Sequence, residues 1–248
     1  MSEFGVQTPE TLVLLHGFGG TRHTWDRVVA LLDPQRYRPL ALDLPGHGEL
    51  ASYKRPITFA GCVQMVLAAA PSSFALCGYS LGGRVALHVA LAAPERVSRL
   101  LLISTSPGIE DAVERARRRE ADNALAERLE HEPLESFIDS WSAQPLFATD
   151  PSDVLRLAEE DQRRNHARSL AAALRGLGTG EMDSLWVRLG ELTMPVTILV
   201  GERDAKYRML GERMSQQLPR ARLLTLAGGH RLALECPQEL ARALASRL

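Results

Sequence analysis

The sequence predicts a doubly wound α/β fold, in which helices cover both faces of a mostly parallel sheet. Two observations indicate this fold: short, continuously apolar runs typical of fully buried strands, and helix-period segments that alternate with them. A third observation, the long stretch between Ile103 and Val196 where the alternation stops, indicates a helical insertion. Ligands bind such sheets beyond the carboxyl ends of the strands, so the loops after the strands are where we expect chemistry.

The expected elements follow one another along the chain. We expect strands at the apolar runs 11–15, 39–42, 74–77, 99–103, 196–200 and 222–226. Helix-period segments fall at 25–32, 58–69, 81–92 and 207–217. The insertion, about 108–190, holds four more expected helices, 111–129, 134–141, 152–161 and 167–174, which proline-containing dipeptides separate. Such helices form either a cap over the strand ends or a solvated extension. We expect a cap, within one domain spanning residues 1–248.

The balance of charge restricts the partners. The 248 residues are enough for one domain with a full core, and Lys+Arg 29 against Asp+Glu 30 gives a formal charge of −1. Such a chain has no basic field to attract nucleic acid or an anionic membrane. We therefore expect a small-molecule partner, no nucleic acid and no membrane. A monomer and a loose homodimer both remain open.

The cysteines and the first residues of the chain indicate the cellular compartment in which the protein is expected. Cys62, Cys77 and Cys236 are an odd set without metal-type spacing, so neither a disulfide framework nor a zinc site is expected. No apolar run is long enough to span a bilayer, and residues 1–5 lack the features of a signal peptide. The sequence also lacks a nucleotide or redox-cofactor motif. We expect a cytoplasmic protein without metal or cofactor.

One short motif points to a nucleophile. The run Gly78-Tyr79-Ser80-Leu81-Gly82 lies between the expected strand 74–77 and the expected helix 81–92. In a nucleophile elbow the serine sits at a sharp strand-to-helix turn, and glycines two residues away on either side let the backbones approach closely. The pattern alone also occurs in ordinary turns, but the strand before it and the helix after it favour a functional serine. We predict that Ser80 is the nucleophile.

A serine hydroxyl needs a base, and two later strand ends supply candidates. The strand 196–200 is followed by Gly201-Glu202-Arg203-Asp204, and the strand 222–226 by a loop ending in Gly228-Gly229-His230. The order Ser, Asp, His matches the elbow architecture. We predict that His230 removes the Ser80 proton and that Asp204 holds the imidazole tautomer and stabilises the imidazolium.

Alternatives remain for these roles. Asp43, after an earlier strand, is the competing carboxylate, although the sequence that follows it reads as a structural turn. Asp204 as a turn residue and His230 as a surface histidine remain the non-catalytic interpretation. The loop His16-Gly17-Phe18-Gly19-Gly20 suits an oxyanion hole, for which we expect the backbone N–H groups of Phe18 and Leu81. No His/Asp/Glu cluster has metal-ligand spacing, so no metal site is expected.

Taken together, these motifs resemble the α/β-hydrolase superfamily over nearly the whole chain. The matching positions are 16–20, 43–48, 78–82, Asp204 and His230. The resemblance implies an α/β-hydrolase fold, with six or seven strands because the first expected strand already begins at Thr11. It does not fix the reaction, since the superfamily includes esterases, carbon–carbon hydrolases, haloperoxidases, lyases and receptors.

A narrower resemblance rests on four segments, 78–84, 114–122, 141–147 and 201–207. They are similar to the 2-succinyl-6-hydroxy-2,4-cyclohexadiene-1-carboxylate synthases, the lyases of menaquinone biosynthesis. This resemblance implies elimination of pyruvate from 2-succinyl-5-enolpyruvyl-6-hydroxy-3-cyclohexene-1-carboxylate, a polycarboxylate, by a serine base without an acyl-enzyme. One departure is Arg231, directly after His230, where the family usually keeps a polar residue; the sequence does not say whether it reaches the site.

Arg84 gives this resemblance a physical basis. It lies four residues after Ser80 on the following helix, so it shares a helix face with the serine. A guanidinium binds a carboxylate through two charge-assisted hydrogen bonds. Such a group would orient a polyanionic substrate, whereas a simple ester has no carboxylate for it to bind. A salt bridge to a neighbouring carboxylate is the alternative role.

The resemblance further implies substrate-binding residues in the insertion. Arg118 is the choice from Arg117-Arg118-Arg119, since only one face of a helix looks inward. Arg164 is the choice from a stretch where Arg163 and Arg168 compete. Trp141 is expected as a cap wall or indole donor, with packing as the alternative. Tyr79 is expected to donate to a substrate carboxylate or to pack in the elbow.

Three functions therefore follow from the sequence. The first is the pyruvate-eliminating lyase. The alternative is a serine hydrolase of small esters or carbon–carbon bonds that forms a covalent Ser80 intermediate. The third is a non-catalytic receptor or interaction protein that retains the triad.

Overall fold

The computed structural model describes residues 8–53 and 56–246; residues 1–5, on which the signal-peptide expectation rested, lie outside them. Six strands form one sheet in the order β2-β1-β3-β4-β5-β6, and every neighbouring pair is parallel. The strands are β1 (Glu10–Leu15), β2 (Tyr37–Leu42), β3 (Phe74–Tyr79), β4 (Val97–Ile103), β5 (Val196–Gly201) and β6 (Ala221–Leu226). The predicted doubly wound parallel sheet is confirmed, and each predicted strand is present with slightly wider bounds.

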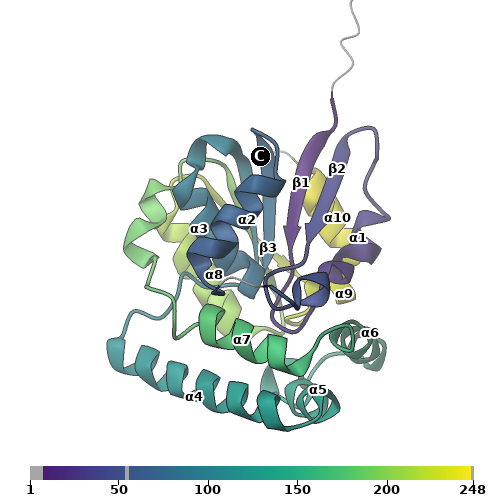
Figure 1. Cartoon of the computed structure of the whole chain (residues 1–248). Helices are drawn as coiled ribbons and strands as arrows, with labels where there is room; N and C mark the ends of the chain where they lie inside the picture. Colours follow the sequence, from purple (N-terminus) through teal and green to yellow (C-terminus); the bar gives the residue numbers. More distant parts are fainter. Residues whose placement is uncertain (1–7, 54–55, 247–248) are drawn as a thin grey trace, which may run out of the picture.

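Helices cover both faces of the sheet (Figure 1). One face carries α2 (Phe59–Ala69), α3 (Leu81–Ala92) and α8 (Ala205–Gln217), and the other carries α1 (Asp26–Val29), α9 (Leu232–Glu235) and α10 (Pro237–Ala245). Successive strand residues alternate between these faces: Val13 and Leu15 pack with α3, whereas Leu12 and Leu14 pack with α10. The pattern explains why the strands read as continuous apolar runs.

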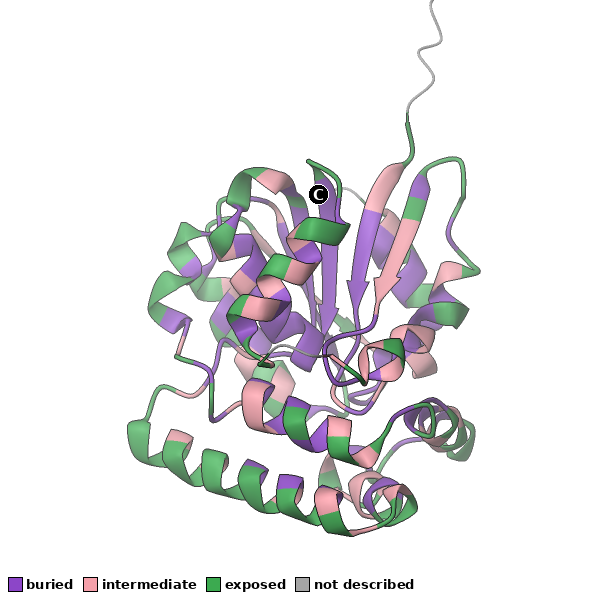
Figure 2. Ribbon diagram, in the orientation of Figure 1, coloured by how far each residue is buried: buried purple, intermediate pink, exposed green. Residues whose placement is uncertain are grey.

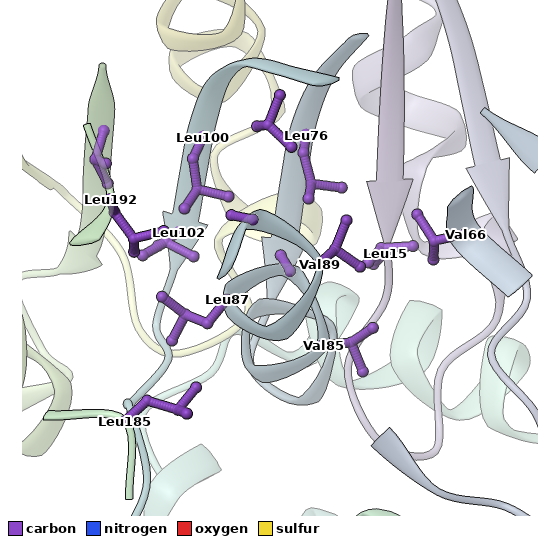
Figure 3. Close-up of a cluster of buried hydrophobic side chains, with 14 of the residues drawn as sticks. Leu15, Val66, Leu76, Val85, Leu87, Val89, Leu100, Leu102, Leu185 and Leu192 are labelled. Atoms are coloured by element: carbon purple, nitrogen blue, oxygen red, sulfur yellow. The ribbon is translucent and has the colours of Figure 1, made fainter. Parts of the chain in front are cut away.

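The α3 face of the sheet forms the larger core. Figure 3 shows part of it, with Val85, Leu87 and Val89 of α3 among strand residues such as Leu15 and Leu102. Each of these five side chains is fully buried. Burying a side chain of this size contributes roughly 1.5–3 kcal/mol. This packing holds α3, and with it the residue that precedes α3, firmly against the sheet.

Between β4 and β5 the chain forms four helices that lie across the carboxyl ends of the strands (Figure 1). These insertion helices are α4 (Ala112–His131), α5 (Leu134–Ser142), α6 (Ser152–Gln162) and α7 (Ala167–Leu177). Asp111 caps α4 by accepting from the Glu114 N–H at 2.8 Å. The insertion helices have their own apolar cluster, which includes Ile138 and Leu170, while the outer side of α4 is exposed (Figure 2).

Two local expectations need correction. The segment 25–32, predicted as one helix, forms a 3₁₀ turn at Arg22–Trp25 followed by the short α1. The helices α9 and α10 were not predicted. Both differences concern short amphipathic pieces, whose period cannot be established over so few residues. Within residues 8–53 and 56–246, no helix is long and apolar enough to cross a membrane.

Candidate active site

Ser80 occupies the sharp turn between β3 and α3. Its backbone has φ 51° and ψ −108°, a strained conformation for a residue with a side chain. The Ser80 N–H donates to the Ile103 carbonyl at 2.9 Å, and the Thr105 hydroxyl donates to the Ser80 carbonyl at 2.7 Å. Neighbouring backbone thus fixes the turn from both sides and holds the Ser80 hydroxyl at the carboxyl end of the sheet.

Glycines on either side of Ser80 allow the turn to form. A Cβ at Gly78 would overlap the Gly82 carbonyl, and a Cβ at Gly82 would overlap the Leu15 carbonyl. Backbone cannot move out of the way as a flexible side chain can. The close approach of β1, β3 and α3 therefore requires these glycines, which accounts for the Gly-x-Ser-x-Gly pattern.

The structure brings Ser80, His230 and Asp204 into one hydrogen-bonded chain. His230 Nε2 lies 3.2 Å from Ser80 Oγ, and His230 Nδ1 lies 2.7 Å from Asp204 Oδ2. His230 and Asp204 are both almost fully buried. The carboxylate only accepts, so this network assigns the ring proton to Nδ1 and leaves Nε2 free to accept the serine proton. The geometry suits general-base activation of Ser80.

Asp43, the competing carboxylate, has other partners. Its Oδ1 accepts from the Arg22 N–H at 2.7 Å, and its Oδ2 accepts from the Glu49 N–H at 3.0 Å. Asp43 therefore ties the loop after β1 to the turn after β2. It is Asp204, and not Asp43, that bonds the His230 ring.

The loop after β1, which carries Phe18, forms a tight turn beside Ser80. Its Gly17 carbonyl accepts from the Gly20 N–H at 3.1 Å, with Gly19 at φ +77°, so the N–H of Phe18 is not used by this turn. Leu81 begins α3, and its N–H is among the first-turn donors that lack an intrahelical acceptor. Phe18 lies in the loop after β1, and Leu81 directly follows Ser80 at the start of α3.

His16 braces this loop. Its Nε2 accepts from the Leu44 N–H at 2.9 Å, so its Nδ1 carries the proton and donates to the Gly17 carbonyl at 2.8 Å. Burial lowers the pKa of His16, which keeps the ring neutral and preserves this pair of bonds. His16 therefore holds together the loop after β1 and the turn after β2.

A cavity of about 520 Å³ opens above Ser80 between the sheet and the insertion helices. Its wall includes the side chains of the triad and five cations. The cations are Arg84 of α3, Arg118 of α4, Arg203 of the loop before α8, Lys206 of α8 and Arg231 of the loop before α9. A cavity with several cations favours an anionic ligand.

Arg84 is one of the two buried cations in this wall. It is 8 % exposed, and its Nη1 donates to the hydroxyl of Thr179 at 2.6 Å. Burial lowers the pKa of Arg84 to about 10, with Arg118 acting in the same direction, so the guanidinium remains charged at neutral pH. The alternative role in a salt bridge is not what the structure shows, because this partner is a neutral hydroxyl.

Arg118 is the member of its arginine run that lines the cavity. Its Nε donates to Asp122 Oδ1 at 2.8 Å, while Arg119 pairs with Glu181 at 2.8 Å outside the cavity. Arg164 was predicted to contact substrate, but the structure does not place it in the cavity wall. Helix α6 ends at Gln162, and Arg164 lies beyond it with its side chain 55 % exposed, 3.8 Å from Asp161 and outside the cavity wall.

Aromatic residues form the apolar part of the wall. Trp141 lines the cavity, and its ring centroid lies 5.2 Å from that of Phe18 and 6.2 Å from that of Phe147. Tyr79 lies against the triad, with its ring centroid 5.3 Å from that of His230. Burial raises the pKa of the Tyr79 hydroxyl, so it stays protonated and can donate to an anion.

Several cavity residues were not among the predicted site residues, and four of them carry polar groups next to the triad or the cations. Tyr207, whose ring centroid lies 4.7 Å from that of His230, and Lys206 both follow Asp204 at the start of α8. Gln162 and Arg231 complete the set. Lys206, Tyr207 and Arg231 could have been predicted, because each lies in or just after a loop at a strand end. Gln162 could not, because the sequence does not show which side of α6 faces the cavity. Burial lowers the pKa of Lys206, and Arg118 and Arg84 lower it further.

No cluster of three or more potential metal ligands is present within the described part of the chain. All three cysteines are free and buried.

Comparison with known proteins agrees with this geometry. The chain matches the alpha/beta hydrolase family over residues 12–243. It is 36 % identical over 217 residues to 2-succinyl-6-hydroxy-2,4-cyclohexadiene-1-carboxylate synthase from Klebsiella pneumoniae subsp. pneumoniae, covering 84 % of this chain and 82 % of the relative. The synthase from Escherichia coli O1:K1 is 34 % identical over 245 residues, covering 96 % and 93 %. The structure of MenH from S. aureus superposes with a TM-score of 0.91 at 32 % identity, covering 98 % of this chain and 95 % of that one.

Proposed function

This chain belongs to the alpha/beta hydrolase family, and from that premise we propose that it is a lyase of menaquinone biosynthesis. It eliminates pyruvate from 2-succinyl-5-enolpyruvyl-6-hydroxy-3-cyclohexene-1-carboxylate and so forms the product named in its relatives, 2-succinyl-6-hydroxy-2,4-cyclohexadiene-1-carboxylate. The observation that carries the proposal is Arg84, a buried and charged guanidinium with a neutral partner, in the same cavity as Ser80.

The structures of substrate and product fix which bonds change. The succinyl ketone is on C2, the ring double bond joins C3 and C4, and the enolpyruvyl oxygen is on C5. Removal of the C2 proton and cleavage of the C5–O bond shift the double bonds to C2 and C4 and release the enolate of pyruvate. The C2 proton lies next to the ketone, so its removal places negative charge on the ketone oxygen.

The site residues divide these tasks. His230, oriented by Asp204 at 2.7 Å, takes the proton of Ser80, and the Ser80 oxygen takes the C2 proton. The N–H groups of Phe18 and Leu81 stabilise the enolate oxygen. The imidazolium of His230 returns a proton to the departing pyruvate enolate, which closes the cycle without a covalent intermediate.

Cations and aromatic groups hold the substrate. Arg84 and Arg118 bind carboxylates, since a guanidinium offers paired donors to a planar anion. Tyr79 donates a further hydrogen bond, and Trp141 covers the ring. In this proposal the insertion helices, about 108–190, act as a cap that excludes water from the enolate.

The decisive experiment compares Arg84→Ala with the wild type by measuring pyruvate release from the enolpyruvyl substrate. Arg84→Ala is expected to lower kcat/KM by more than about a hundredfold, or about 3 kcal/mol of transition-state stabilisation. Arg119→Ala is the matched control, because Arg119 pairs with Glu181 outside the cavity. A loss below tenfold for Arg84→Ala, or no pyruvate release by the wild type, would contradict the proposal.

The second candidate is a serine hydrolase, because the 3.2 Å contact between His230 and Ser80 serves acylation equally well. An activated acyl ester would then leave a covalent adduct on Ser80, which mass spectrometry would detect. Product release would show an initial burst. A receptor, in contrast, would bind a ligand and turn nothing over.

We also propose a cellular location and an oligomeric state for the enzyme. It acts in the cytoplasm as a monomer or loose homodimer and needs no metal or cofactor. The buried, free state of Cys62, Cys77 and Cys236 supports a reducing compartment.

A further inference from the structure

Glu235, the last residue of α9, bonds to both loops that carry the acidic and basic members of the triad. Its Oε2 accepts from the backbone N–H of Gly229 at 2.7 Å, and its Oε1 accepts from Arg203 Nη2. Gly229 directly precedes His230, and Arg203 directly precedes Asp204. One carboxylate thus links the residue before the catalytic histidine to the residue before the catalytic aspartate.

The carboxylate of Glu235 is largely shielded from solvent. Its side chain is 9 % exposed, whereas that of its partner Arg203 is 37 % exposed. Holding an ionised carboxylate at this depth is unfavourable unless its oxygens are hydrogen-bonded, and each oxygen of Glu235 has a donor. Hydrogen bonds to a charged group are shorter and stronger than those between neutral groups. Both links are therefore suited to restrict the loops that they join.

The peptide group between Gly228 and Gly229 is held at both ends. Its carbonyl, on Gly228, accepts from the backbone N–H of Arg203 at 3.0 Å, and its N–H, on Gly229, is the donor to Glu235. Two successive glycines leave the backbone before His230 with wide conformational freedom. The bond to Glu235 restricts this freedom at the residue next to the catalytic histidine.

Small displacements of His230 matter because its ring works over short distances on two sides. Nδ1 lies 2.7 Å from Asp204 Oδ2, and Nε2 lies 3.2 Å from Ser80 Oγ. The second distance is already at the long end of the usual hydrogen-bond range. A misplacement of about 1 Å in a catalytic group can cost about a hundredfold in rate. A backbone that moves freely before His230 would therefore lower the rate of proton transfer.

We propose that Glu235 is a positioning residue of the triad, which keeps the His230 ring in line with Asp204 and Ser80 by tying Gly229 to Arg203. Glu235 is not part of the cavity wall, so it acts through His230 and not on the substrate. This inference rests on the proposed function only in that His230 acts as the base. It holds for elimination and for ester hydrolysis alike.

The test compares Glu235→Ala and Glu235→Gln with the wild type. Alanine removes both links, whereas the amide oxygen of glutamine can still accept from the Gly229 N–H. In Glu235→Ala we expect kcat of pyruvate release to fall about tenfold or more and KM to stay within about twofold. The downfield proton NMR resonance of His230 Nδ1–H should shift or broaden, because the bond to Asp204 is no longer held in place. Glu235→Gln should fall between Glu235→Ala and the wild type in both readouts.

Glu239→Ala is the matched control. Glu239 lies on the neighbouring helix α10 with its side chain 49 % exposed, 3.9 Å from Arg242. Its removal also deletes one glutamate of an arginine pair, but leaves the two catalytic loops untouched. Glu239→Ala should therefore match the wild type in kcat and in the His230 resonance. Thermal unfolding shows that each variant is folded at the temperature of the assay.

Each outcome decides the proposal. A lower kcat in Glu235→Ala together with a changed His230 resonance supports it. An unchanged kcat, or a lower kcat with an unchanged resonance, overturns it, because Glu235 then stabilises the fold without acting through His230. If Glu235→Ala does not fold, Glu235→Gln decides by the same two readouts. A wild type that releases no pyruvate contradicts the proposed function, and the resonance alone then tests Glu235.

Discussion

The carboxylate of Asp161, near the end of α6, accepts a hydrogen bond from the backbone N–H of Thr21 at 2.9 Å. The same carboxylate accepts from the Thr24 hydroxyl at 2.8 Å and from the Thr21 hydroxyl. An insertion helix is therefore bonded to the loop after β1, which carries Phe18. If the N–H of Phe18 serves the oxyanion hole as proposed, changes at Asp161 should therefore reach catalysis through this loop.

Asp161→Ala is expected to impair catalysis of every substrate that needs the oxyanion hole. We expect kcat to fall about tenfold or more, for the enolpyruvyl substrate and for a neutral ester alike, and stability to fall by about 1–3 kcal/mol because buried donors lose their acceptor. Steady-state kinetics and thermal unfolding measure the two effects. Glu160→Ala, on the exposed side of the same helix, is the control and should change stability by less than about 0.5 kcal/mol.

Thr179→Val is expected to weaken substrate binding without removing any charge. The Thr179 hydroxyl accepts from Arg84 Nη1 at 2.6 Å, and valine keeps the shape while removing the acceptor. Arg84 then loses its fixed direction, so KM should rise roughly three- to tenfold, less than in Arg84→Ala, with a smaller change in kcat. An unchanged KM would show that packing alone directs Arg84.

Gly82→Ala tests the steric argument at the elbow. The new methyl group would overlap the Leu15 carbonyl, which is backbone of a central strand. We expect destabilisation above about 3 kcal/mol, or failure to fold, because neither α3 nor β1 can shift without disturbing the core. Gly190→Ala provides the comparison, since a Cβ at Gly190 meets nothing within 4 Å. Urea unfolding of the two variants measures the difference.

Local sequence patterns predicted the strands and the turn that carries Ser80, because both depend on neighbouring residues. Strand 74–77 was recognisable from its apolar run, and the serine from the glycines that its turn requires. Asp204 and His230 were identified by order along the chain, since parallel strands bring their carboxyl ends to one edge.

The substrate-binding residues were harder to predict, because they depend on helix rotation and on contacts between distant segments. Arg118 and Arg164 were chosen by the same reasoning. Arg118 lines the cavity, whereas α6 ends two residues before Arg164 and leaves that side chain in solvent. Arg231 was visible as a departure after His230, but its partners Asp150 and Phe147 come from a segment more than eighty residues earlier in the chain. No local pattern records such a contact.

Lys206 gives a prediction in which stability and binding change in opposite directions. Burial lowers the pKa of Lys206, and the charges of Arg118 and Arg84 add to this effect while Asp204 opposes it. A lysine with a lowered folded-state pKa makes the protonated folded protein less stable, and the penalty disappears as pH rises through that pKa towards the ordinary value. Lys206 as a whole residue is exposed, so solvent screening keeps this penalty small. Lys206→Met should therefore raise the melting temperature only slightly at neutral pH, and the difference should shrink at alkaline pH.

Binding of a polycarboxylate reverses the preference of Lys206, because an anion stabilises the ammonium group. Affinity of the wild type should then fall as pH rises through the lowered pKa of Lys206, with proton uptake on binding in that range. Lys206→Met should bind more weakly at neutral pH and show a flatter pH profile. Calorimetry in two buffers of different ionisation enthalpy measures the proton uptake. A variant that melts lower than the wild type and binds equally well would mean that Lys206 is a packing residue whose charge does not face the substrate.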